Sequence, residues 1–114
     1  MYKIYHNPRC KKSRAGLAFM QEKGAELEII QYLKQTIGFD ELSDIFVKLN
    51  KKPSEMIRKQ EAIFKSDFKG KEFNEDEWLK IIIQHPKLLQ RPIVVGKHKA
   101  IWGDPADYLE VFFK

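Results

Sequence analysis

The sequence predicts an α/β fold with a mixed four-stranded sheet, and three features of its pattern indicate this class. Residues 1–34 have the pattern of a strand, a helix and a strand, and residues 87–114 that of two strands and a helix. Residues 35–86, between these parts, carry only helical patterns. A chain of 114 residues that is 43% hydrophobic has the size of one domain with its own core. We therefore expect a single domain over residues 1–114 that carries a helical insertion at 35–86.

The first part is predicted to be a β-α-β unit. Lys3–His6 is a short extended run, and Asn7-Pro8 ends it because a residue before proline avoids the helical region. Ser13–Lys23 has a helix-forming composition, and Gly24 suits the left-handed conformation that often follows a helix. The apolar run that starts at Leu27 predicts a second strand, buried within the sheet.

The insertion is predicted to contain three helices. Apolar residues recur at helical spacing through Asp40–Leu49, and a shorter helix is expected at Ser54–Gln60. Asn74 is a good N-cap with Glu77 three residues later, as in a capping box, and the helix that they begin should end at His85.

The last part is predicted to be a β-hairpin followed by a helix. Ile93–Val95 is a β-branched strand, and Lys99–Trp102 can return beside it through a tight turn. Asp104 is expected to be the N-cap of the last helix and Pro105 its first residue. Its apolar side chains are expected to face the core: Tyr108, Leu109, Phe112 and Phe113.

Charge and composition restrict the partners and the compartment. The formal charge of +5 favours anionic partners, but basic residues are mixed with acidic ones, so nucleic acid is not the expected partner. No apolar run is long enough to cross a membrane, and Met1-Tyr2-Lys3 leads into a strand instead of a signal peptide. We therefore expect a cytoplasmic protein without membrane contact. The histidines have no Cys or carboxylate cluster around them, so no metal site is expected.

The one cysteine, Cys10, lies between the first strand and the first helix. Free N–H groups at a helix start stabilise a negative charge, and His6 could add positive charge if its ring turned toward the sulfur. Four neighbours in the sequence add positive potential: Arg9, Lys11, Lys12 and Arg14. A lone cysteine is often a small buried hydrophobe, but a thiol among four cations makes a poor core residue. We therefore interpret Cys10 as an activated nucleophile, whose redox cycle must take its second thiol from another molecule.

Two segments of the sequence form a specific pair of motifs. They are His6-Asn7-Pro8-x-Cys10-x-x-Ser13-Arg14, after the first strand, and Arg91-Pro92-Ile93-Val94-Val95, near the end. With these motifs the chain resembles the arsenate reductase-like (ArsC) family, in the branch that depends on glutathione and glutaredoxin. The resemblance implies a thioredoxin-like fold with residues 1–34 and 87–114 as its core and no bound cofactor. It also implies that Pro92 lies in a cis-proline loop facing Cys10.

The resemblance also implies roles for individual residues. Cys10 would attack the arsenic atom of arsenate, and glutathione with glutaredoxin would supply the reducing thiols. Arg58 and Arg91 match the arginines that bind the oxyanion, since paired guanidinium groups suit a tetrahedral anion. His6 and Ser13 match positions that tune the thiol, and Arg14 is expected to add positive charge there.

One position departs from the family pattern and keeps alternatives open. Where the family has a third arginine before the proline of the last helix, this chain has Asp104. This favours, as one alternative, a glutathione-dependent thiol or disulfide reductase that does not use arsenate. A second alternative is a non-catalytic regulator of the Spx type that binds RNA polymerase. Spx regulators sense redox state through a Cys-x-x-Cys pair, and Ser13 stands here in place of its second cysteine.

Overall fold

The computed structural model describes all 114 residues, and its centre is a mixed four-stranded sheet. The strands are β1 (Tyr2–Tyr5), β2 (Leu27–Ile30), β3 (Ile93–Val95) and β4 (Ala100–Trp102). They lie in the order β2-β1-β3-β4, with β1 parallel to β2 and antiparallel to β3, and β3 antiparallel to β4. The predicted α/β class and mixed four-stranded sheet are confirmed.

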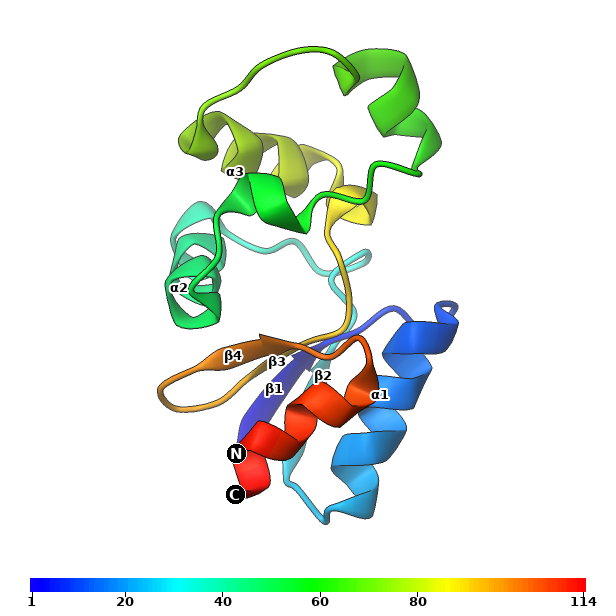
Figure 1. Cartoon of the computed structure of the whole chain (residues 1–114), viewed down its shortest axis with the longest axis vertical. Coiled ribbons are helices and arrows are strands. Elements are labelled where there is room, and N and C mark those ends of the chain that lie inside the picture. Colours follow the sequence, from blue (N-terminus) through cyan, green and yellow to red (C-terminus); the bar gives the residue numbers. More distant parts are fainter.

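Helices cover both faces of this sheet (Figure 1). Helix α1 (Lys11–Glu22) and the C-terminal 3₁₀ helix η4 (Ala106–Phe113) lie on one face, where Ile4 and Val94 belong to a small buried cluster. Helices α2 (Phe39–Leu49) and α3 (Glu75–Gln84) form the larger core on the other face. Side chains alternate between the faces along β1, so Ile4 joins the first core and Tyr5 the second. None of the helices is long and apolar enough to cross a membrane.

Several predicted helix ends are confirmed. Gly24 follows α1 with a φ of 73°, a left-handed conformation that glycine adopts without steric cost. At the start of α3, the Glu77 N–H donates to the Asn74 side chain at 2.8 Å, and the Asn74 N–H donates to the Glu77 carboxylate at 2.9 Å. This reciprocal capping box satisfies two backbone donors that the helix itself leaves free.

Two predicted elements differ in the structure. Strand β2 is an edge strand, and Ile29 is 45% exposed, because β1 is its only neighbour in the sheet. The helix predicted at Ser54–Gln60 is a single 3₁₀ turn, η1 (Pro53–Met56). It stops there because Ile57 pairs with Leu89 in an antiparallel bridge, which draws the backbone into an extended conformation.

The prediction for the last helix was also wrong in two respects. Asp104 is not its N-cap, since the carboxylate of Asp104 binds the Lys12 ammonium at 3.0 Å and Pro105 occupies the N-cap position. Tyr108 does not face the core and is 58% exposed. A 3₁₀ helix has three residues per turn, so Leu109 and Phe112 share the inward face while Tyr108 points outward.

Leu109 and Tyr108 provide a test of this inward face. Leu109 is fully buried between α1 and the sheet, so Leu109→Ala should lower the free energy of unfolding by about 2–5 kcal/mol through cavity formation. Tyr108→Ala removes a mostly exposed ring and should cost less than about 1 kcal/mol. Urea denaturation of both variants measures the difference, and equal losses would contradict the assigned face.

Candidate active site at Cys10

Cys10 lies at the end of the loop that follows β1, directly before the first residue of α1. Its backbone is extended, with φ −95° and ψ 122°, and its N–H donates to the Asn7 carbonyl at 3.0 Å. The His6 N–H donates to the Ile30 carbonyl at 2.9 Å, which ties this loop to the end of β2. The half-buried thiol is therefore held at the positive end of the α1 dipole.

The surroundings of the thiol lower its pKa. Burial of the sulfur is the largest single influence and raises the pKa of Cys10, because a buried thiolate loses hydration. The Ser13 N–H, the Arg91 guanidinium and the Lys12 N–H favour the thiolate and together outweigh burial, so the net shift is downward. The N–H groups at the helix start that were predicted to stabilise the thiolate are therefore those of Lys12 and Ser13.

Arg91 reaches the sulfur from the loop before β3. Its side chain is 8% exposed, and one terminal nitrogen donates to the Lys87 carbonyl at 3.0 Å. The Arg91–Pro92 peptide bond is cis, as the family resemblance implied. Pro92 packs so tightly on α1 that a Cβ at Gly16 would lie 2.5 Å from its ring. Only glycine at position 16 allows this approach, which brings the Arg91 loop against the helix that carries Cys10.

Arg58 is brought toward the same loop by the Ile57–Leu89 bridge. Its N–H donates to the Leu88 carbonyl at 2.7 Å, and the Gln90 N–H donates to the Met56 carbonyl at 3.0 Å. The Nε of Arg58 donates to a Glu61 carboxylate oxygen at 3.1 Å. This contact fixes the side chain through Nε alone and leaves its terminal nitrogens without a protein partner.

His6 and Ser13 form a buried hydrogen-bonded pair. The Asn7 N–H donates to Ser13 Oγ at 3.0 Å, and Ser13 Oγ lies 2.6 Å from His6 Nδ1. Burial, and secondarily the charge of Arg14, lower the pKa of His6, so its ring is neutral near pH 7. One hydrogen bond therefore joins the neutral His6 ring to the Ser13 hydroxyl, which also accepts from the Asn7 N–H. His6 thus contributes hydrogen bonding to the loop and no positive charge.

Two of the local cations have partners of their own. Arg14 is exposed and donates to the Pro8 carbonyl at 3.0 Å, while Lys12 pairs with Asp104. Arg14 is not among the groups that shift the pKa of Cys10, whereas Arg91, distant in the sequence, is.

Tyr32 is a buried residue near Cys10 that the sequence reasoning did not single out. It lies two residues beyond β2, is 1% exposed, and its hydroxyl has no hydrogen-bond partner in the protein. Burial raises the pKa of Tyr32 to about 12, and the charges of Arg91, Arg58 and Cys10 all act on it. The parallel pairing of β1 and β2 was the available signal, since the carboxyl ends of parallel strands meet at one edge.

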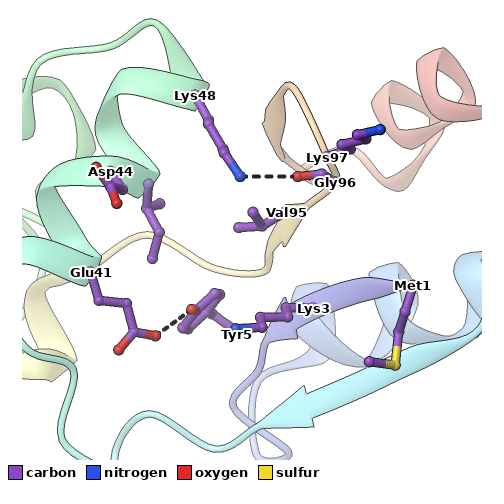
Figure 2. Close-up of a pocket in the computed structure, with 10 residues that line it drawn as sticks. Met1, Lys3, Tyr5, Glu41, Asp44, Lys48, Val95, Gly96 and Lys97 are labelled. Carbon is purple, nitrogen blue, oxygen red and sulfur yellow. Dashed lines mark hydrogen bonds between the residues drawn. The ribbon is translucent and has the colours of Figure 1, made fainter.

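A separate cavity of about 420 Å³ lies between α2 and the sheet (Figure 2). Two hydrogen bonds cross its lining: the Tyr5 hydroxyl donates to Glu41 at 2.5 Å, and Lys48 donates to the Gly96 carbonyl at 3.3 Å. Cys10 does not line this cavity, and no group of His, Cys, Asp and Glu side chains in the chain could hold a metal.

Comparison with known proteins decides the family. The ArsC family model matches residues 5–112. The chain belongs to the ArsC family. The arsenate reductase of Neisseria meningitidis serogroup A is 39% identical over 110 residues, which are 95% of this chain and 94% of the relative. That of Haemophilus influenzae is 36% identical over 106 residues, 91% of each chain.

Solved structures agree with this membership. The arsenate reductase from Vibrio cholerae has a TM-score of 0.89 to this chain, at 33% identity and with 96% of each chain covered. The predicted family and thioredoxin-like fold are confirmed, and this ArsC-family chain is an arsenate reductase-like oxidoreductase.

The charge that acts on Cys10 can be tested by comparing two arginines. Arg91→Gln removes a guanidinium that favours the thiolate and should raise the pKa of Cys10. Arg14→Gln removes an exposed guanidinium that donates to the Pro8 carbonyl, and it should leave the pKa of Cys10 nearly unchanged. The pH dependence of iodoacetamide alkylation measures both, and a larger shift in Arg14→Gln would contradict the assignment.

The neutral His6 ring predicts a pH dependence of stability. The folded state lowers the pKa of His6 below its unfolded value of about 6.5. The unfolded chain therefore binds a proton that the native chain does not, and stability should fall as pH drops below about 6.5. His6→Gln should reduce this dependence in denaturant titrations at pH 7.5, 6.5 and 5.5. His98→Gln, at an exposed turn residue, is the control, and identical slopes in both variants would contradict the prediction.

Proposed function

We propose that this ArsC-family protein reduces arsenate through the Cys10 thiolate, with glutathione and glutaredoxin as external reductants and no bound cofactor. The observation that carries the proposal is the Arg91 guanidinium beside the Cys10 sulfur at the start of α1. The Cys10 nucleophile and the Arg91 cation, which can bind an anion, would then act on the same substrate. The named activity of the relatives in Neisseria and Haemophilus supports arsenate as the substrate. We place the reaction in the cytoplasm, where glutathione is kept reduced.

The oxyanion would bind between Arg91 and Arg58. Each guanidinium can give two parallel hydrogen bonds to oxygens of a tetrahedral anion, which a lysine cannot do. Glu61 engages only the Nε of Arg58, so the terminal nitrogens of this side chain are available to the anion. The backbone N–H groups of Lys12 and Ser13, which favour the thiolate at the start of α1, add an uncharged part to the site.

The reaction balances with two external thiols. The Cys10 sulfur attacks arsenic, an S–As bond forms, and one arsenate oxygen leaves as water after taking up protons. A glutathione thiol then displaces a second oxygen, which also leaves as water, and becomes bonded to arsenic. A glutaredoxin thiolate attacks the glutathione sulfur, so that one mixed disulfide forms and the electron pair of the broken S–As bond reduces As(V) to As(III). Water finally displaces the Cys10 sulfur from arsenic and releases arsenite and the Cys10 thiolate, so this single thiol needs no partner cysteine in this chain.

The remaining predicted residues would act on the loop around the thiol. Ser13 supplies a backbone N–H to the sulfur and a hydroxyl to His6, which holds the turn before α1. Arg14 braces the same turn through the Pro8 carbonyl. Pro92 sets the position of Arg91 by packing on α1 at Gly16. In this proposal, these residues position the thiol and the anion and do not react themselves.

One observation favours a second candidate, a glutathione-dependent thiol or disulfide reductase. Asp104 stands where the family resemblance places a third arginine, and its carboxylate neutralises Lys12 at 3.0 Å. A disulfide substrate needs no third guanidinium, whereas a dianionic arsenate would be held less strongly here. Parallel assays with arsenate and with a mixed glutathione disulfide distinguish the two substrates.

Cys10→Ser tests the thiol mechanism itself. Reduction of arsenate or disulfide, coupled to glutathione and glutaredoxin, should fall by about a thousandfold or more because the hydroxyl is not ionised at neutral pH. Lys97→Ala, in the exposed turn after β3, should react at the wild-type rate. An unchanged rate in Cys10→Ser would exclude the mechanism. No turnover in the wild type, with RNA polymerase captured equally by both forms, would favour the regulator.

A further inference from the structure

Buried polar side-chain atoms without a partner are concentrated beside Cys10. Only three such atoms occur in the chain, namely Tyr32 Oη, Arg91 Nε and Trp102 Nε1. A buried donor without an acceptor costs about 1–3 kcal/mol, so folded proteins rarely keep one unless it has a use. Two of the three belong to Tyr32 and Arg91, and the charge of Arg91 acts on both the Tyr32 hydroxyl and the Cys10 thiol.

The backbone holds Tyr32 at this place. Strands β1 and β2 are parallel and in register, with Tyr5 opposite Ile30. The next residues of both strands continue past the same edge of the sheet, which brings the loop of Cys10 and the loop of Tyr32 together. The Tyr32 ring belongs to the core between the sheet and the insertion, so its position is set by packing.

We propose that Tyr32 is a third ligand of the oxyanion, whose hydroxyl donates an uncharged hydrogen bond to an anion oxygen held by Arg91 and Arg58. This inference rests on the proposed function, since it requires an oxyanion site beside Cys10. Burial keeps the hydroxyl protonated near neutral pH, so it can donate a hydrogen bond. It adds a contact to the anion without adding positive charge, in a site where Asp104 stands at the third arginine's position.

A ligand role is favoured over a purely structural one by comparison with Tyr5. Both tyrosines are buried, Tyr5 as the last residue of β1 and Tyr32 just after β2, but the Tyr5 hydroxyl donates to Glu41 at 2.5 Å while that of Tyr32 has no acceptor. A structural tyrosine satisfies its hydroxyl within the fold, as Tyr5 does. Phenylalanine would fill the site of Tyr32 equally well if only packing mattered.

The test measures anion binding separately from turnover. Wild type, Tyr32→Phe and the matched control Tyr5→Phe are alkylated at Cys10 with iodoacetamide in increasing phosphate or arsenate, with chloride at equal ionic strength as reference. Protection should require about tenfold more anion in Tyr32→Phe, because a hydrogen bond to a charged group is lost. Tyr5→Phe should be protected like the wild type.

Thermal unfolding gives a second readout that a folding defect cannot imitate. Without anion, Tyr32→Phe should be at least as stable as the wild type, because its hydroxyl makes no bond within the protein. Tyr5→Phe should be less stable, since it loses the bond to Glu41. Phosphate should raise the Tm of the wild type and of Tyr5→Phe more than that of Tyr32→Phe.

The outcomes separate this inference from the proposed function. Equal protection of Tyr32→Phe and wild type, or no protection of the wild type by either anion, overturns the role of Tyr32 whatever the turnover. Weaker protection of Tyr32→Phe supports the role. If the wild type then fails to reduce arsenate with glutathione and glutaredoxin, the proposed function fails while the anion ligand stands.

Discussion

The contact between Pro92 and Gly16 is the constraint on which the arrangement of the site depends. Arg91 is far from Cys10 in the sequence, and its guanidinium acts on the sulfur only because the loop before β3 packs directly on α1. The Pro92 carbonyl also accepts the Gly103 N–H at 2.9 Å, so the same loop is tied to the segment before the last helix. A helix start and an arginine from a distant segment are thereby fixed beside one thiol.

The helical insertion is joined to this arrangement by one short backbone pairing, between Ile57 and Leu89. The Ile57–Leu89 bridge ends η1 and holds Arg58 against the residues that precede Arg91. Both guanidinium groups therefore come from chain segments that hydrogen-bond to each other, and their separation is set by backbone contacts. Sites supported in this way lose little conformational freedom when an anion binds, because the side chains are already ordered.

Local patterns predicted the parts of the fold that local interactions decide. The capping box at Asn74 and the glycine end of α1 depend on neighbouring residues, and both were predicted from the sequence. The extended backbone at Ile57 depends on pairing with Leu89, a contact between residues distant in the chain that no window of the sequence contains. The same holds for the candidate site: motifs singled out Cys10 and Pro92, while Tyr32 lay inside an apolar run of the sequence and was interpreted as part of a buried strand.

The electrostatics of the thiol show why counting neighbouring charges in the sequence misleads. Four cations flank Cys10, yet Lys12 is neutralised by Asp104 and Arg14 turns to the Pro8 carbonyl, and both side chains lie in solvent that screens their charge. Arg91 is 8% exposed, so its charge is screened far less and acts where the local dielectric is low. One buried arginine that the tertiary fold brings to the thiol therefore affects the pKa of Cys10 more than the exposed cations that neighbour it in the sequence. The same reasoning applies to an uncharged donor such as the Tyr32 hydroxyl. Solvent weakens a hydrogen bond to an anion, and burial of the donor reduces this weakening.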